Sequence, residues 1–379
     1  MPAKIHPLLK PKREKQRRLL ALDGGGIRGL ITLGVLEKLE ADLGNALKAG
    51  KDFRLAHYFD FIGGTSTGAI LAAGLSIEMK VSELISFYMS AGPMMFEKEL
   101  LYKRLWNTYR SDPLKQMLQD VLGARTLLGS DKLKSLLLLV MRNATTDSPW
   151  PITNNPNAKY NDRSRADCNL NLPLWQLVRA STAAPVYFPP EVIVVGQQQF
   201  VFVDGGVTPY NLPAFLMYRM ATARPYGLSW KIGEDKMMIV SIGTGSVPSL
   251  GPDASDPSRS LLGTATSIAG ELMNGMAYDQ DINCRTIGRC VFGPHLDREV
   301  GDLVISKVKD KGPERHFSYA RYNPELTRKG LDELGFKNVS PERVAKLDAV
   351  DASKDLLAIG RAYGEKWVRV KDHFPAFLS

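Results

Sequence analysis

Short apolar runs, each followed by a glycine-containing turn and then by a helical repeat of apolar residues, recur along the first part of the chain. The run 18–22 ends at Asp23, and the glycine-rich residues 24–29 lead into leucines spaced as in a helix. A second run ends near Ile62 and leads through another turn into the small apolar residues 69–77. Two successive strand-turn-helix units predict an α/β fold with a mostly parallel central sheet and helices on both faces.

Further segments extend this pattern. The remaining predicted strands are 136–141, 200–203 and 237–242. Helical patterns extend over 80–128, 174–180 and 353–371. Within the first of these, a Gly-Pro pair at 92–93 and Ser-Asp-Pro at 111–113 predict breaks. Residues 143–167 are rich in Asn, Pro, Thr and Asp, so they predict a long loop.

The chain is predicted to have three parts. Residues 1–17 form a basic N-terminal arm, 18–245 form the α/β domain, and 246–379 form a C-terminal extension packed on that domain, where regulation could lie. The net charge of +9 is concentrated in the arm, because residues 1–18 hold seven Lys and Arg against one Glu. Such an arm is either a solvated tail or a segment attracted to anionic lipid or nucleic acid.

Composition and apolar runs limit the class of protein. Hydrophobic residues make up 44% of the chain, which excludes disorder as its main state. Residues 61–77 are uncharged over 17 positions, but their first half is too rich in Gly, Ser and Thr to span a bilayer. The basic start is not followed by a long apolar core, so no secretory signal is expected. We therefore expect a cytoplasmic protein.

Cysteine and histidine spacing gives no sign of a bound metal. The three cysteines are Cys168, Cys284 and Cys290. They include no C-x-x-C pair, and no His lies at ligand spacing from them. The sequence predicts neither a disulfide framework nor a metal site, and it predicts no cofactor.

A G-x-S-x-G sequence at 64–68 stands where a predicted strand gives way to a predicted helix. In such an elbow the serine takes a strained backbone conformation, which is tolerable only if the flanking residues lack bulk, as Gly64 and Gly68 do. The turn lifts the serine hydroxyl to the mouth of the sheet. Ser66 is therefore the candidate nucleophile.

The glycine-rich loop at 24–29 has two interpretations. It matches G-x-G-x-x-G, which binds dinucleotides, but that motif also needs an acidic residue about 20 positions later at the end of a second strand. Asp42 has the distance but falls within the predicted helix. Alternatively, bare amides at a helix start would stabilise an oxyanion formed at Ser66. This oxyanion hole would comprise Gly24, Gly25 and Gly26, with positive charge from Arg28.

A serine nucleophile needs a base, and two arrangements stay open. The order serine, aspartate, histidine of the α/β-hydrolases would use Ser66, Asp204 and one later histidine. The candidates for that histidine are His295, His316 and His373. Alternatively Asp204 itself is the base, with Gly205 and Gly206 allowing close approach. Because a carboxylate is a weak base unless burial raises its pKa, this arrangement predicts an apolar site such as a lipid chain would occupy.

Three motifs in one order resemble the patatin-like phospholipase family. They are D-G-G-G-x-R-G at 23–29, G-T-S-T-G at 64–68 and D-G-G at 204–206. Residues 180–190 and 211–213 add to the resemblance, which covers about 18–245. It implies a three-layer α/β sandwich and a Ser66–Asp204 dyad without histidine. It also implies an oxyanion hole at the glycine loop, and hydrolysis of phospholipid esters at the inner face of a membrane.

Softer matches at 149–156 and 319–324 resemble a bacterial group within this family that is activated by cyclic oligonucleotides in antiphage defence. A cyclic dinucleotide activator is therefore expected as a partner beside membrane phospholipids. A nucleic-acid polymer is not expected, and the oligomeric state, homo-oligomer included, stays open. Cationic groups and flat rings suit an anionic nucleotide. The candidate activator-binding residues are Arg315, Tyr319, Arg321 and Tyr322.

Overall fold

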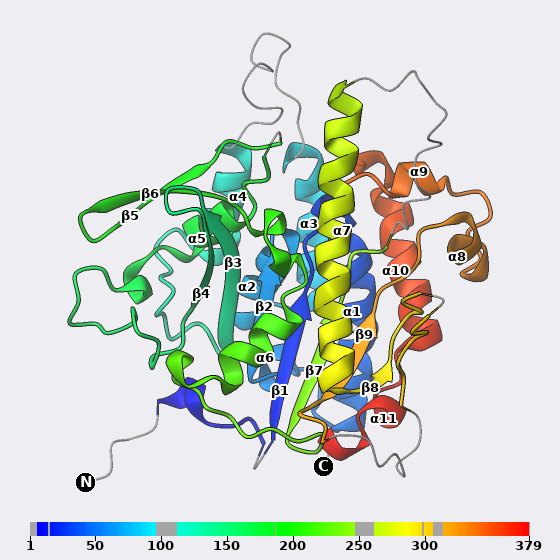
Figure 1. Cartoon of the computed structure of the whole chain (residues 1–379), viewed down its shortest axis with the longest axis horizontal. Coiled ribbons are helices and arrows are strands. Elements are labelled where there is room, and N and C mark those ends of the chain that lie inside the picture. Colours follow the sequence, from blue (N-terminus) through cyan, green and yellow to red (C-terminus); the bar gives the residue numbers. More distant parts are fainter. Residues whose placement is uncertain are drawn as a thin grey trace.

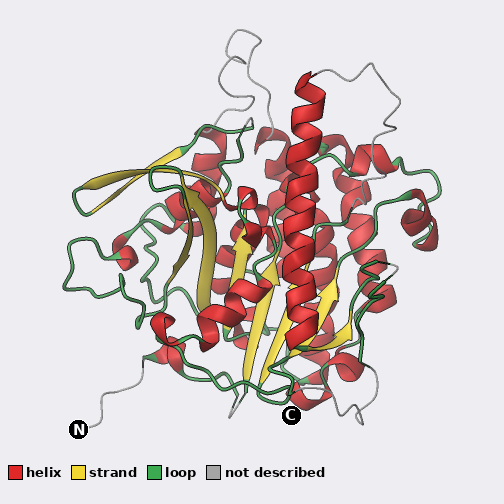
Figure 2. Cartoon of the chain, in the orientation of Figure 1, coloured by secondary structure: helices red, strands yellow, loops and turns green. Residues whose placement is uncertain are grey.

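A computed structural model of the chain describes residues 6–13, 16–95, 112–185, 187–246, 261–297, 299–305 and 314–378. Within these ranges, nine strands form a single sheet with helices on both faces (Figures 1 and 2). The predicted α/β class with a mostly parallel sheet is confirmed.

The strands of this sheet come from nearly the whole described chain. They are β1 (Arg17–Leu22), β2 (Phe61–Thr65), β3 (Leu136–Asn143), β4 (Ser148–Thr153), β5 (Glu191–Val195), β6 (Gln198–Asp204), β7 (Met237–Ile242), β8 (Arg289–Phe292) and β9 (Ser318–Tyr322). The order is β5-β6-β3-β2-β1-β7-β9-β8, and β4 also pairs with β3. Neighbours from β3 to β8 run parallel, whereas β4 and β6 run antiparallel to β3.

Helices cover both faces of the sheet. They are α1 (Gly29–Ala46), α2 (Thr67–Ser76), α3 (Val81–Met95), α4 (Asp112–Leu122), α5 (Leu174–Ser181), α6 (Ala214–Thr222), α7 (Leu261–Ile287), α8 (Arg328–Glu333), α9 (Pro341–Val344), α10 (Ser353–Trp367) and α11 (Val370–His373). In the view of Figure 1, α6 and α7 lie in front of the sheet, and α1, α2 and α10 lie behind it. Helix α10 packs along α1. None of the helices in the described ranges is both long and apolar enough to cross a bilayer.

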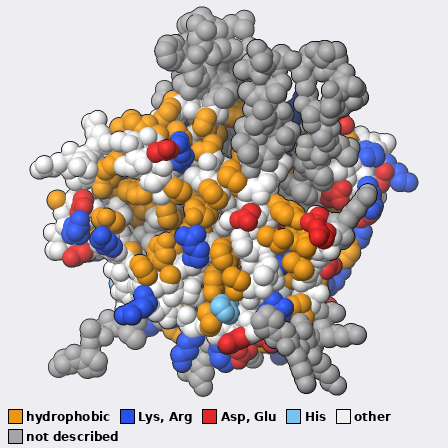
Figure 3. Space-filling model, viewed as in Figure 1, with side chains coloured by type: hydrophobic (Ala, Val, Ile, Leu, Met, Phe, Trp, Pro, Cys, Tyr) orange, Lys and Arg blue, Asp and Glu red, His pale blue; other side chains and the backbone are white. Residues whose placement is uncertain are grey.

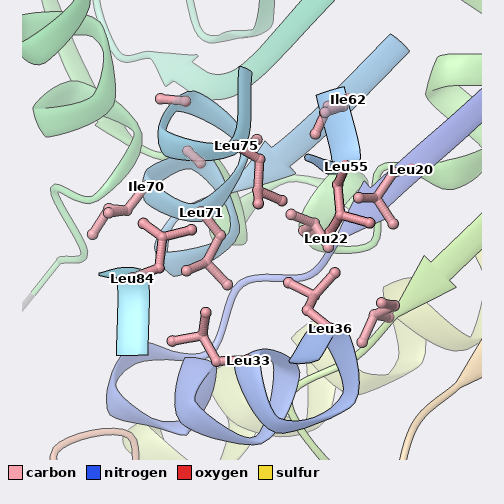
Figure 4. Close-up of a cluster of buried hydrophobic side chains, with 14 of the residues drawn as sticks. Leu20, Leu22, Leu33, Leu36, Leu55, Ile62, Ile70, Leu71, Leu75 and Leu84 are labelled. Carbon is pink, nitrogen blue, oxygen red and sulfur yellow. The ribbon is translucent and has the colours of Figure 1, made fainter. Parts of the chain in front are cut away.

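The core lies on the two sides of the sheet because alternate side chains of a strand point to opposite faces. On β1, Leu20 and Leu22 join the cluster that α1 and α2 cover, part of which Figure 4 shows. Leu19 and Ala21 join a second cluster on the side of α6. All four residues are fully buried, so a one-residue slip of β1 would exchange the two sides.

Most predicted elements are confirmed, and two expectations are wrong. The predicted strand 237–242 coincides with β7, and predicted strands overlap β1, β3 and β6. Helix α3 continues to residue 95, so the predicted break at 92–93 is absent. The predicted loop 143–167 contains β4, which pairs with β3. Residues 246–260 are rich in Gly, Ser, Asp and Pro, so the sequence predicts a loop there; apart from Ser246 they lie outside the described residues.

The residues after 245 take part in the sheet. Strand β9 pairs with β7 in parallel, and β8 pairs with β9. The division of the chain at residue 245 stays a prediction, but these contacts join the last third of the chain to the same sheet as β1 and β2.

The described part of the basic arm lies at the amino ends of the parallel strands. The Lys12 amide donates to Asp60 Oδ1 at 2.8 Å, and the Arg17 guanidinium lies 4.4 Å from the centre of the Trp230 ring. Arg18 is fully buried and donates from Nη2 to the Phe377 carbonyl at 3.2 Å. The Lys12 ammonium also donates to the Lys134 carbonyl, so the cations of Lys12 and Arg17 in the arm bind the body of the protein. These contacts lie at the end of the sheet opposite to the carboxyl ends of its strands (Figure 1).

Candidate active site

Ser66 stands between β2 and α2 on a strained turn. Its φ and ψ of 55° and −123° are a conformation that non-glycine residues rarely adopt. The first turn of α2 packs against the end of β1, where a Cβ on Gly68 would lie 2.7 Å from the Asp23 carbonyl oxygen. The Ser66 amide donates to Ser181 Oγ at 3.0 Å, and the Ser181 hydroxyl donates to the Val140 carbonyl at 2.5 Å. The elbow predicted from the sequence is present.

Asp204 is the last residue of β6 and lies beside Ser66. Its carboxylate accepts the Gly206 amide at 2.6 Å, and the Ser66 side chain lies close enough to lower the pKa of the carboxyl group. Gly205 lets the two loops approach, because a Cβ there would lie 2.9 Å from Thr65 Cγ2. The structure thus brings together Ser66 and Asp204, which are 138 residues apart in the sequence.

Burial changes the acidity of this carboxyl group. Asp204 is 2% exposed, and the loss of water raises its pKa to about 6, although hydrogen bonds from Ser66 and Gly206 and the positive charge of Arg179 act in the opposite direction. At pH 7 such a group is still about nine-tenths ionised. It is also a stronger base than an exposed carboxylate.

The glycine loop passes directly beside the elbow. A Cβ on Gly24 would lie 3.1 Å from Ser66 Cβ, so a larger residue at this position would press on the serine. The Gly24 amide donates to the Asn211 carbonyl at 3.2 Å, and the Gly24 carbonyl accepts the Thr244 hydroxyl at 3.0 Å. Both hydrogen-bonding groups of this peptide unit are thus occupied by neighbouring loops.

The next two amides are unoccupied. Among the described residues, the backbone N–H groups of Gly25 and Gly26 have no acceptor. Gly26 has a φ of 59°, which favours glycine, and begins a short 3-10 helix that leads into α1. Free amides at a helix start attract negative charge. Arg28 follows at once and donates to the Ala345 carbonyl at 3.3 Å, and burial lowers its pKa to about 10, so it remains protonated at neutral pH.

Comparison with known proteins identifies the family of the chain. The sequence model described as "Patatin-like phospholipase" matches residues 20–218, which is more than half of the chain. The chain belongs to the patatin-like phospholipase family.

Curated relatives include patatins of potato species. Patatin group M-2 of Solanum tuberosum is 31% identical in an alignment of 252 positions that covers 62% of this chain and 62% of that protein. Patatin-17 of Solanum cardiophyllum is 32% identical in an alignment of 250 positions that covers 60% of each chain. This patatin-like chain thus spans less than two thirds of the length of these relatives. Among solved structures, VipD from Legionella pneumophila aligns with a TM-score of 0.35 and 15% identity, over 91% of this chain and 67% of VipD.

The histidines of this patatin-like chain lie elsewhere. All five are within the described ranges, and none forms a hydrogen bond with Ser66 or Asp204 there. His316 Nδ1 is 2.6 Å from the Tyr218 hydroxyl, and His373 Nδ1 is 2.6 Å from the Tyr322 hydroxyl. The structure therefore brings no histidine to the serine, as a Ser-Asp-His triad would need. Asp42, the acidic residue considered for dinucleotide binding, pairs with Lys38 on α1 instead.

The four expected activator-binding residues do not form a surface. Tyr319, Arg321 and Tyr322 lie in β9 and are at most 4% exposed. Their polar atoms bind within the protein, Tyr319 to Asp281 and Arg321 to Asp23. The expectation is wrong because this segment is an internal strand whose side chains enter the two helical layers. Arg315, before the strand, donates to the Thr286 carbonyl at 2.7 Å.

Three residues around the patatin-like site were not assigned a role from the sequence. They are Ser181, Asn211 and Thr244, which hold the elbow and the glycine loop through the contacts above. The first two belong to the matched segments 180–190 and 211–213, so the motif signal was present. It carried no information about which backbone group each residue would bind.

Proposed function

We propose that this protein is a lipid acyl hydrolase that cleaves carboxylic esters with Ser66 as nucleophile and Asp204 as base. The observation that carries the proposal is that a serine on a strained elbow lies beside a buried carboxylate, whose pKa burial raises to about 6. Membership of the patatin-like phospholipase family supports an acyl ester as substrate.

In the first step Ser66 Oγ attacks the ester carbonyl carbon while its proton passes to Asp204. The carbonyl oxygen becomes an oxyanion, and the unoccupied amides of Gly25 and Gly26 are the groups proposed to donate to it, with Arg28 adding positive charge. Collapse expels the alcohol, which takes the proton from Asp204, and leaves an acyl-serine. Water then attacks the acyl group with Asp204 again as base, releasing the fatty acid and restoring Ser66.

A membrane glycerophospholipid is the proposed substrate. Strands β5 and β6, which lead to Asp204, carry the exposed valines Val192, Val194 and Val201. Figure 3 shows hydrophobic side chains gathered at the upper left of the view, the part of the molecule where Figure 1 draws this pair of strands. An acyl chain near the dyad would also exclude water and favour the raised pKa of Asp204.

Covalent labelling tests the chemistry. A fluorophosphonate should add one phosphonyl group to Ser66, detected by mass spectrometry of the peptide, and Ser66→Ala should abolish both labelling and lipid hydrolysis. Product analysis on defined phospholipids would then identify the ester cleaved. An unlabelled wild-type protein that instead binds NAD(H) in a titration would support the dinucleotide-binding interpretation of residues 24–29.

We also propose that a cyclic dinucleotide gates the activity at the inner face of a bacterial membrane. The support is the resemblance of residues 149–156 and 319–324 to cyclic-oligonucleotide-activated phospholipases, together with the damage that an ungated enzyme would do to its own membrane. A ligand shifts the equilibrium between an inactive and an active state only as far as it binds one state more tightly than the other. Activation by a bound nucleotide should therefore be accompanied by thermal stabilisation. Lipid hydrolysis and melting temperature, measured with a panel of cyclic di- and trinucleotides, test this. Light scattering on the same samples would show whether a homo-oligomer forms. Full activity without any cyclic nucleotide, together with no shift of the melting temperature when one is added, would refute the gating proposal.

A further inference from the structure

A buried ion pair lies directly behind the glycine loop. Arg321 donates from Nη1 to Asp23 Oδ1 at 2.9 Å and from Nη2 to Asp23 Oδ2 at 2.5 Å, and its Nη1 also donates to Ser241 Oγ at 2.8 Å. Each member of the pair is 4% exposed. Asp23 joins β1 to Gly24, whereas Arg321 comes from β9, 298 residues later. The pair thus joins the loop to a strand that lies beyond the family-matched residues 20–218.

Stability alone is a weak reason for such a pair. Removing two charges from water costs about as much as their attraction returns, and well-packed apolar residues often serve equally well. What a bidentate arginine adds is geometry, because two parallel hydrogen bonds fix the carboxylate in both position and orientation.

The neighbouring loop needs an external anchor. Gly24, Gly25 and Gly26 carry no side chains that could fix their peptide planes, and glycine has wide conformational freedom. Contacts from outside must therefore fix the directions of the two unoccupied amides. Asn211 and Thr244 hold Gly24, as described above, and the Leu347 carbonyl accepts the Ile27 amide at 2.9 Å. The Asp23–Arg321 pair holds the entrance of the loop from β1.

We propose that Arg321 is a positioning residue for the oxyanion hole, acting through Asp23. It touches no reacting atom, and its charge is balanced by the Asp23 carboxylate. Its role is to fix the direction in which Gly25 and Gly26 present their N–H groups. This inference rests on the proposed hydrolase function and assigns a catalytic task to the C-terminal third of the chain.

A double variant separates positioning from stability. Arg321→Met alone leaves a buried carboxylate unpaired, so we expect a lower melting temperature and lost activity. Asp23→Asn/Arg321→Met removes both charges, so the melting temperature should return to within a few degrees of wild type. If Arg321 positions the loop, this double variant should remain roughly 10² slower than wild type, both in kcat on a soluble ester and in the rate at which Ser66 is phosphonylated. Its KM should change less than about threefold. Arg321→Lys, which keeps the charge but lacks the guanidinium that donates two parallel hydrogen bonds, should retain part of the activity.

The matched control is the buried pair of Asp281 and Arg285 on α7. Arg285 also holds its carboxylate through two hydrogen bonds, at 2.9 and 2.7 Å. Arg285 Nη1 also donates to the Pro294 and Asp302 carbonyls, and Met loses both bonds, so Asp281→Asn/Arg285→Met should lower the melting temperature yet keep the wild-type kcat. A kcat for Asp23→Asn/Arg321→Met within about threefold of wild type would overturn the proposal. A wild-type protein that is not labelled at Ser66 would refute the hydrolase function itself, which is a separate result.

Discussion

Replacing Asp204 by Asn should abolish ester hydrolysis and at the same time stabilise the folded protein at neutral pH. Asn has the same shape and keeps the oxygen that accepts the Gly206 amide. It removes the charge that burial disfavours, and it cannot take the proton of Ser66. The same substitution therefore acts in opposite directions on activity and on stability.

The size of the gain follows from the pKa of Asp204. The difference between the ordinary value of 3.8 and about 6 in the folded protein corresponds to about 3 kcal/mol, at about 1.4 kcal/mol per pH unit. Because the folded-state pKa is the higher one, the folded protein holds the proton more tightly. The penalty is absent below about pH 3.8, grows as pH rises and is complete above about pH 6. Relative to wild type, Asp204→Asn should thus gain about 1 kcal/mol at pH 4.5 and about 3 kcal/mol at pH 7.

Urea unfolding at pH 4.5, 5.5 and 7, followed by circular dichroism, measures this difference. Ser66→Ala is the control, since it is also inactive but keeps the carboxylate and loses a hydrogen bond that lowers the pKa of Asp204. It should show no gain at pH 7. A gain for Asp204→Asn that is the same at all three pH values, or no gain, would mean that burial does not set the acidity of this group.

Three further predictions concern the reaction. If Asp204 is the base, kcat/KM should fall about tenfold per pH unit below pH 6, and a profile flat down to pH 5 would exclude that role. In Gly25→Ala the added Cβ would lie 2.6 Å from Thr244 Cβ, so the loop must shift. We expect kcat to drop by roughly 10² to 10³ at similar KM. An unchanged kcat would mean that the Gly25 amide does not donate to the oxyanion. The variant His295→Ala/His316→Ala/His373→Ala should keep kcat within about threefold of wild type, whereas a folded but inactive variant would restore the Ser-Asp-His alternative.

The sequence contained enough information to locate Ser66 and Asp204, the proposed dyad, because Ser66 directly follows a strand and Asp204 ends one, each beside small residues. Apolar runs located β1, β3, β6 and β7, and the glycines beside Ser66 and Asp204 marked the two places where loops approach closely. These signals are local, so they can be detected in a window of about ten residues.

Other features depend on partners far away in the chain. Strand β4 was missed because Pro149 and Pro151 argue against a strand. The two prolines are two residues apart, so their missing N–H groups would lie on the same edge of the strand. Within the described sheet β4 pairs with β3, so its other edge makes no strand pairing there and the prolines are tolerated. The segment around Arg321 was interpreted as a nucleotide-binding surface because its charge and rings suggested exposure. Its partner Asp23 lies 298 residues earlier, and no local pattern indicates that pairing.

The hydrogen bonds between the first strand and residues 376–377 have a consequence for folding during synthesis. Beside the bond from Arg18, the Phe377 carbonyl accepts the Tyr58 hydroxyl at 3.1 Å, and the Ala376 carbonyl accepts Gln16 Nε2 at 2.7 Å. A chain that emerges from the ribosome N-terminus first cannot form these contacts until residues 376 and 377 have been made and have emerged. Truncation after residue 373 should accordingly lower the melting temperature. Strand β1 leads directly into Asp23 and the glycine loop, so a nascent chain lacks these hydrogen bonds at the base of the strand until residues 376 and 377 have left the ribosome.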